Sequence, residues 1–310
     1  SGRHAGTLML QLFIAYQPLI DLFLLHSGLA LAQYLVLRAG VFSIANAGLT
    51  AIGAYLSAWL TLKAGWHPAL AMLLGALAGM FVSMLLSLPL ARLRGVYQAI
   101  ATLAFVQVVL SLNVYAESIT GGAMGMNGIP KVVSTGTLAV ALLCTLYIMW
   151  AINQTRLGRA FDAIRQDETV AASLGTSVRY YQTVAFALSG ALAGFYGGLE
   201  AFHSYSIEPA RFGFEFVVAI LSYVVLGGRR SIWGPVVGTA VLLALPELAR
   251  PLAEYRTLVY GLIMVLVMGY LPRGVYDTFV EYLYRKRIAR MDAAAAAAAR
   301  TAAPATGGTR

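Results

Sequence analysis

Charged residues are scarce in this sequence. Asp, Glu, Lys and Arg together make up 11% of the 310 residues, whereas a soluble domain carries about 25% charged residues. Hydrophobic residues account for 59%, and they gather in runs long enough to cross a bilayer as helices. The alternating runs of roughly ten residues that mark a membrane β-barrel are missing. The composition therefore predicts an all-α polytopic membrane protein.

Clusters of chemically reactive residues are missing as well. The single cysteine, Cys144, lies in an apolar run, which excludes a disulfide framework. The four histidines are scattered, and no cluster of His, Cys and Asp has the spacing of a metal site. The glycine-rich stretch 120–130 lacks the Gly-Lys-Ser/Thr ending of a phosphate-binding loop. We therefore predict no catalytic residue, metal or cofactor in this chain, so that any ATP and magnesium would be bound by other subunits.

The apolar runs divide the chain into three parts. We expect an N-terminal segment at 1–17 (a truncated span or an interfacial piece), a transmembrane domain at 18–272 and a basic, partly disordered cytoplasmic tail at 273–310. Pro18 is expected to open the first full span, because proline is tolerated in the first turn of a helix. About nine to ten transmembrane helices are expected, with full spans near 18–37, 43–62, 68–90, 96–116, 136–153, 180–203, 213–227, 234–249 and 257–271.

The basic residues indicate how these spans are oriented. If the tail is cytoplasmic and the spans alternate, 16 of the 22 Lys and Arg residues fall on the cytoplasmic side and 5 fall outside, with Arg3 undecided. Such an excess is typical of cytoplasmic loops, and it explains the net charge of +9 without a nucleic-acid partner. The segment 155–178 and the loop 227–231 then share the cytoplasmic face.

Small residues four apart predict close helix packing. They let helix backbones approach one another, and in lipid such packing drives helix association. We expect this contact mainly within one subunit; a dimer contact or a moving seam is the alternative. The glycines concerned are Gly190, Gly194 and Gly198, with Gly75 and Gly79, and with Gly234 and Gly238.

A few polar residues lie within or near the spans. Asn46, Gln107 and Asn113 are candidates for lining a polar pathway, although a hydrogen bond between helices is the commoner role of such residues. Glu200 and His203 are three apart and so share a helix face. We interpret them as a polar pair at the membrane interface, with a role in the pathway as the alternative.

Segment 155–178 is the most charged stretch between two apolar runs. Leu157, Phe161 and Ile164 fall on one face of a predicted short helix, and Asp162 lies on another. Gly175 is placed to end this helix with a left-handed cap. An amphipathic helix on the membrane surface suits insertion into a groove on a partner protein. The alternative is an interfacial helix that touches lipid headgroups.

Several stretches of this sequence resemble one protein family, and they occur in the same order as in that family. The sequence is similar to permeases of branched-chain amino acid ABC transporters, of the high-affinity leucine, isoleucine and valine uptake type. Related members of that family move urea, amides or other amino acids. The stretches that carry the resemblance are 39–58, 92–109, 120–130, 158–175 and 224–241.

The resemblance implies a multi-subunit importer in the bacterial inner membrane. The chain would pair with a second homologous permease, as a heterodimer or a homodimer, and would bind two ATPase subunits in the cytoplasm. A periplasmic binding protein would deliver the substrate. The coupling loop would place its apolar side in a cleft on the ATPase, with its charges setting the orientation. Its residues would be Gly158, Arg159, Phe161, Asp162, Ile164, Arg165, Asp167, Glu168, Ala171, Ala172 and Gly175.

The sequence departs from the family pattern in places that bear on the substrate. Arg229 and Arg230 stand where the family usually has small or apolar residues, and Ala219 stands where relatives often carry glutamate. Branched-chain or related amino acids are the expected substrates, with urea or amides as the alternative.

An ATP-independent secondary transporter or channel for a small polar solute is the alternative function. A protein with that function is expected to carry buried charged residues, or helices that are broken at the membrane midplane.

Overall fold

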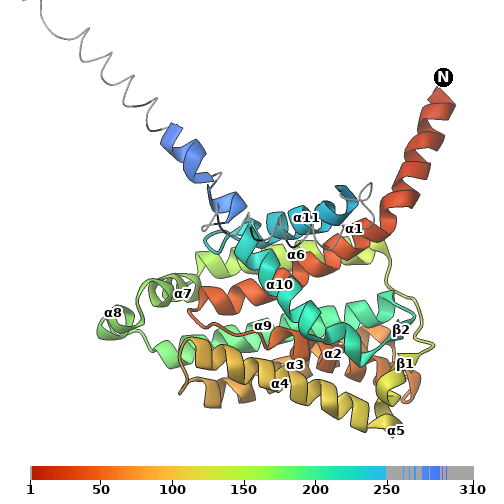
Figure 1. Cartoon of the computed structure of the whole chain (residues 1–310), viewed down its shortest axis with the longest axis horizontal. Coiled ribbons are helices and arrows are strands. Elements are labelled where there is room, and N and C mark those ends of the chain that lie inside the picture. The colour runs from red at the N-terminus through yellow and green to blue at the C-terminus, as the bar shows by residue number, and fades with distance from the viewer. Residues whose placement is uncertain are drawn as a thin grey trace, which may run out of the picture.

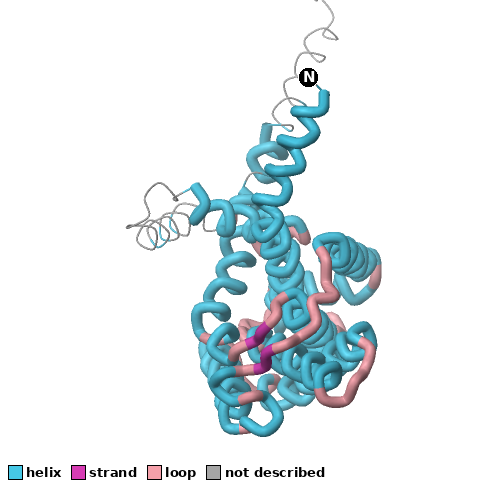
Figure 2. The backbone as a smooth tube through the Cα atoms, turned by 90° about the vertical axis from the view of Figure 1, so that its right-hand side faces the viewer, coloured by secondary structure: helices cyan, strands magenta, loops and turns pink. Residues whose placement is uncertain are grey.

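The structure is a computed structural model. It describes residues 2–248 and, beyond them, positions 261, 265, 269, 274–278, 280–286, 288 and 291. Within this part the regular elements are helices except for one two-stranded ribbon, in which β1 (Met126–Asn127) pairs antiparallel with β2 (Ser206–Ile207) (Figures 1 and 2). The predicted all-helical fold class is confirmed.

The helices follow one another with short connections. In chain order they are α1 (Gly2–Arg38), α2 (Asn46–Leu62), α3 (Pro68–Leu90), α4 (Val96–Tyr115), α5 (Glu117–Thr120), the 3₁₀ turn η1 (Gly122–Met124), α6 (Thr135–Gln154), α7 (Arg156–Gln166), α8 (Glu168–Ser173), α9 (Val178–His203), the 3₁₀ turn η2 (Pro209–Phe212), α10 (Phe214–Gly227) and α11 (Trp233–Leu248).

Six helical segments among the described residues are long and apolar enough to cross a membrane. They are Tyr16–Arg38, Pro68–Leu90, Val96–Tyr115, Thr135–Gln154, Val178–His203 and Pro209–Gly227. This number is below the nine to ten spans expected. Helices α2 and α11 have 17 and 16 residues, so each is only about 25 Å long, short of the ~30 Å hydrocarbon core. The span expected at 257–271 lies almost wholly outside the described residues.

The first helix corrects one expectation. Pro18 does not open a helix but lies inside α1, which runs without a break from Gly2 to Arg38. Proline removes one backbone hydrogen bond, yet membrane helices tolerate this loss because neighbouring groups satisfy the freed carbonyl. The boundary expected between residues 17 and 18 therefore does not interrupt the helix.

Helix α9 forms the centre of the bundle, with α2 and α3 on one side and α1 on the other (Figure 1). Glycines permit this close packing. A Cβ atom on Gly79 would collide with the carbonyl oxygen of Gly190, and one on Gly194 would collide with that of Gly75. Gly198 lies against Met72 of α3. The predicted glycine ridge of α9 thus lies at a contact between helices of one chain.

The second glycine pair lies between α11 and α10. A Cβ atom on Gly234 would collide with the carbonyl oxygen of Gly228, and one on Gly238 with that of Tyr223. This pair, like the α9 ridge, brings two backbones of the same chain together.

The bundle has two distinct ends. Arg38, the last turn of α6, α7 and α8 lie at one end, which we call the α7 end; the β1–β2 ribbon, α5 and the last turn of α9 lie at the other, the ribbon end (Figure 1). Helices α1, α6 and α9 each run from one end to the other, so a movement at one end can reach the opposite end through them.

Candidate coupling site

Helix α7 is amphipathic, and its apolar side faces the bundle. Phe161 is fully buried and Ile164 is 1% exposed. Phe161 packs among Leu35 of α1 and Met149 of α6. The sequence predicts that this apolar side enters a cleft on a partner, whereas in the structure Phe161 and Ile164 pack against their own chain; a partner contact of this segment stays a prediction. A helix at the end of a bundle covers the nearest apolar surface, and here that surface belongs to its own chain.

Arg38 fixes α7 to the end of the first span. Its Nε donates to Asp162 Oδ1 at 2.9 Å and its Nη2 donates to Asp162 Oδ2 at 2.7 Å. This two-pronged geometry is the strongest form of an arginine–carboxylate pair. Arg38 also donates to the side chain of Asn153, at the end of α6, and its Nη2 lies 3.5 Å from the carbonyl oxygen of Gly158. One arginine therefore joins α1, α6 and α7.

Arg165 fixes α7 to the loop before α11. Its Nη1 donates to the carbonyl oxygen of Arg229 at 2.9 Å, and its Nη2 lies 3.7 Å from Asp162 Oδ1. Segment 155–178 and loop 227–231 thus lie side by side; their assignment to the cytoplasm stays a prediction. Asp277 Oδ2 accepts the backbone N–H of Arg230 at 3.0 Å, and burial raises the pKa of the Asp277 carboxyl.

Asp167 divides the segment into two helices. The sequence predicts one helix, but the chain is extended at Asp167 and α8 starts after it. The backbone N–H groups of Val170 and Thr169 donate to Asp167 Oδ1 at 3.0 and 2.7 Å. This is the N-cap arrangement that aspartate favours. The same two donors, Val170 first, lower the pKa of the Asp167 carboxyl, because they stabilise its charged form.

Gly175 ends α8 as the sequence predicts. Its φ of 82° lies in the left-handed region, where a side chain would be strained. Its N–H donates to the carbonyl oxygen of Ala172, and the N–H of Thr176 donates to that of Ala171, both at 3.0 Å. These two bonds are the pattern of a Schellman motif.

The outer surface of α8 carries two apolar side chains that sequence reasoning missed. Val170 is 54% exposed and Leu174 is 78% exposed, and they lie one helical turn apart. Of the expected coupling residues on α8, Ala171 is buried and Ala172 is exposed. The position of the Asp167 cap could have indicated this face, because it sets where α8 begins. Among the remaining expected residues, Arg159 is exposed.

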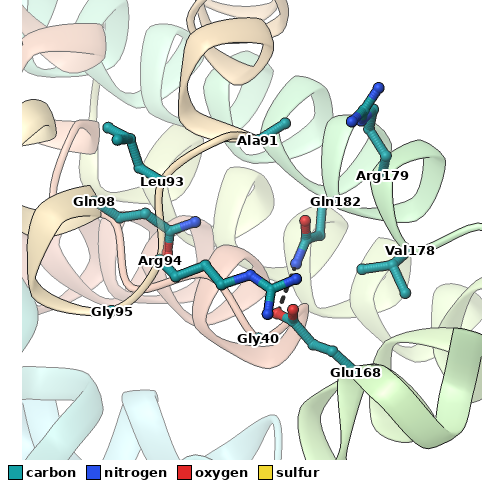
Figure 3. Close-up of a pocket in the computed structure, with 10 residues that line it drawn as sticks. All are labelled: Gly40, Ala91, Leu93, Arg94, Gly95, Gln98, Glu168, Val178, Arg179 and Gln182. Atoms are coloured by element: carbon teal, nitrogen blue, oxygen red, sulfur yellow. Dashed lines mark hydrogen bonds between the residues drawn. The ribbon is translucent and has the colours of Figure 1, made fainter.

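A cavity of about 390 Å³ lies between α8, the turn after α3 and the start of α9 (Figure 3). Glu168 enters it from α8, and Gln182 Nε2 of α9 donates to Glu168 Oε1 at 3.0 Å. Figure 3 shows the guanidinium group of Arg94, from the turn after α3, pointing toward Glu168. Polar side chains of three separate elements thus converge beside α8, where a change in its position would alter their contacts.

The three pathway candidates lie in different surroundings. Asn46 is buried, and its Oδ1 accepts from Ser189 Oγ at 3.0 Å, which joins α2 to α9. Gln107 is exposed on α4. Asn113 lines an apolar cavity of about 440 Å³ between α2 and α4, together with Tyr55. The structure does not bring these three residues together.

At the ribbon end, Glu200 and His203 do not pair with each other. Glu200 Oε1 lies 3.8 Å from Arg211 Nη1, and His203 Nε2 lies 3.8 Å from Asp21 Oδ2. Sequence reasoning missed Asp21 altogether, although a carboxylate near the start of an apolar span is a signal of function. Among the described residues no group of three or more His, Cys, Asp or Glu side chains could hold a metal ion.

Comparisons with known proteins identify a family and several relatives of this chain. The sequence pattern described as the permease component of branched-chain amino acid transport systems matches residues 20–268. The chain is 32% identical over 271 residues to the high-affinity branched-chain amino acid transport system permease protein LivM of Escherichia coli, and equally to that of Salmonella typhimurium. In each case the match covers 76% of this chain and 64% of the relative.

A more distant relative is the probable branched-chain amino acid transport permease protein LivH of Methanocaldococcus jannaschii, 29% identical over 164 residues, which cover 49% of each chain. No solved structure matches the chain. The pattern match extends over most of the sequence and includes segment 155–178. The chain therefore belongs to the family of permease components of branched-chain amino acid transport systems.

Proposed function

We propose that this chain is the transmembrane permease subunit of an ABC importer that moves branched-chain or related amino acids into the cell. Membership of the family and six candidate spans support this function. Permease components of this kind are not enzymes and hold no cofactor, because ATP is hydrolysed on separate subunits. The importer lies in a bacterial inner membrane, with the α7 end and the C-terminus in the cytoplasm.

The observation that carries the proposal is the construction of the α7–α8 segment. Helix α7 is held to three other elements through Arg38, Asp162 and Arg165, while α8 exposes Val170 and Leu174. A rigid base with an exposed apolar tip is what a docking element requires, because the tip gains free energy on burial and the base transmits force. We place the ATPase contact on α8, and α7 transmits its movement.

The proposal includes further partners, which the family resemblance implies. A second homologous permease, as a heterodimer or a homodimer, packs beside this chain in the membrane, so that two ATPase subunits dock on two α8 helices. A substrate-binding protein delivers its cargo at the ribbon end. Lipid covers the rest of the apolar surface.

Co-purification tests the docking surface. The wild-type chain and a Val170→Asp, Leu174→Asp variant are purified in mild detergent with the ATPase subunits of the same transport system. We expect the wild type to retain the ATPases and the variant to lose them at unchanged thermal stability. Met124→Asp is the matched control, because Met124 is 81% exposed at the ribbon end. Normal retention by the double variant would exclude α8 as the contact.

Uptake into vesicles tests the function itself. With the second permease, the ATPases and the binding protein present, we expect ATP-dependent uptake of leucine, isoleucine or valine and none of urea. Uptake of urea or an amide would assign the chain to the other substrate class. Transport by this chain alone, without ATPases, would favour the secondary transporter or channel and overturn the proposal.

A further inference from the structure

A polar cavity at the ribbon end lies outside the coupling site. It measures about 390 Å³, within the range of small-molecule sites. Three elements form it: the start of the first span in α1, the loop before α6 with the first residue of α6, and the last residue of α9. Its polar lining residues are Gln17, Asp21, Lys131, Ser134, Thr135 and His203.

Asp21 is the unusual member of this lining. Its side chain is only 7% exposed, and its Oδ1 has no hydrogen-bond partner among the described residues. Its other oxygen, Oδ2, lies 3.8 Å from His203 Nε2, and His203 Nδ1 also lacks a hydrogen-bond partner within the described part of the chain. A buried carboxylate oxygen without a donor costs free energy, so an isolated one in a cavity indicates that a ligand supplies the donor.

The opposite charge lies on another wall of the same cavity. Lys131 lines it and is exposed, with no ion-pair partner within the described part of the chain. Asp21 and Lys131 therefore face one space without pairing with each other. The N-terminus of α6 opens onto this space as well, through its N-cap Ser134 and its first residue Thr135. A helix N-terminus and an ammonium group both favour an anion.

The two walls thus have complementary preferences. The Asp21 wall favours an ammonium group and the Lys131–α6 wall favours a carboxylate. A free α-amino acid carries both groups on one carbon and satisfies both walls at once. Urea and simple amides carry neither charge and would leave the Asp21 Oδ1 atom and the Lys131 ammonium group without a partner, which costs affinity. Gln17 Nε2 donates to Thr135 Oγ1 at 3.1 Å and so holds α1 and α6 together at the edge of this site.

We propose that this cavity binds the ammonium and carboxylate groups of the transported amino acid as it enters from the binding protein. The inference rests on the proposed function and narrows its substrate to α-amino acids over amides. The polar lining recognises the charged groups that all α-amino acids share. It leaves discrimination among their side chains to other parts of the system.

Equilibrium binding of radiolabelled leucine to the purified complex of both permeases and the ATPases, without binding protein, tests the inference. We expect leucinamide, which lacks the carboxylate, and 4-methylpentanoate, which lacks the ammonium group, to compete at least about tenfold more weakly than leucine. Asp21→Asn and Lys131→Gln should each weaken leucine binding by about tenfold or more. Lys131 is exposed, so its variant tests the site even if the Asp21 variant folds poorly.

Glu208→Gln is the matched control, because Glu208 is an exposed acid at the same end of the bundle that does not line the cavity. It should bind leucine like the wild type. Equal competition by leucinamide, or unchanged leucine binding in both cavity variants, would overturn the inference. Association of the ATPases is measured on the same samples. Failure of the ATPases to associate would count against the importer itself, whereas intact association with charge-independent binding would count against the cavity alone.

Discussion

Arg38, at the end of α1, and Asp162 of α7 join these two helices through two hydrogen bonds of 2.9 and 2.7 Å. The two side chains are unequally covered: that of Arg38 is 7% exposed and that of Asp162 is 40% exposed. Arg38 also shares α1 with Asp21, 17 residues earlier, about 25 Å away along a straight helix. The same helix therefore contacts both the coupling segment and the cavity at the ribbon end.

The unequal burial of this pair predicts unequal effects of mutation. Asp162→Ala leaves a buried guanidinium group without its counter-charge, which we expect to cost about 3 kcal/mol. Arg38→Met removes the buried charge and leaves Asp162 partly in water, so we expect a smaller cost of about 1 kcal/mol. Unfolding of the purified chain in detergent measures both changes, and the double variant gives the coupling energy. A larger loss for Arg38→Met than for Asp162→Ala would contradict this account.

The contact of α9 with α3 predicts strong sensitivity at Gly190. A side chain there would meet the backbone of Gly79 and the Ser83 side chain, so Gly190→Val should separate the two helices and cost about 3 kcal/mol or more. Gly136 of helix α6 is the control, since among the described residues a Cβ atom there would meet only Ser134 Oγ, at an ordinary contact distance of 3.8 Å. Gly136→Ala should raise stability by up to about 1 kcal/mol. Thermal unfolding of the two variants in the same detergent compares them; equal behaviour would refute close packing at Gly190.

Gly175 predicts an effect that comes from the backbone alone. Apart from its two chain neighbours, no described residue has an atom within 4 Å of the position that its Cβ would occupy, but its φ is 82°. Gly175→Val should therefore strain the end of α8 by about 1–2 kcal/mol, and Gly175→Asn should be milder because asparagine tolerates this conformation. Coupled uptake in vesicles should fall in the order glycine, asparagine, valine. Full uptake in the valine variant would show that this cap is not needed for coupling.

The cap at Asp167 predicts a dependence on pH. Its carboxyl has a lowered pKa in the folded chain, so the stabilisation is complete above the ordinary value of 3.8 and is lost as the pH falls through the lower, folded value. Asp167→Asn keeps a cap acceptor but does not titrate. We expect the difference in thermal midpoint between wild type and this variant to be constant near neutral pH and to shrink in acid. A constant difference down to strongly acidic pH would contradict the assignment.

The sequence by itself determined the class of this protein. Scarce charge and long apolar runs require a membrane bundle, because a bilayer excludes unpaired polar groups. The sequence also determined the end of α8 at Gly175, because a left-handed cap depends only on the glycine and on the residues next to it in the chain. The small-residue spacing on α9 likewise marked the face that approaches α3.

Only the tertiary structure decided what each face meets. Helical periodicity places Phe161 and Ile164 on one side of α7, but it does not say whether a partner or the chain's own bundle covers that side. Here the bundle covers it. The contact of Asp21 with His203 joins residues 182 positions apart, and spacing within one helix had suggested Glu200 as the neighbour of His203. Such contacts depend on how whole helices pack, which no local pattern specifies.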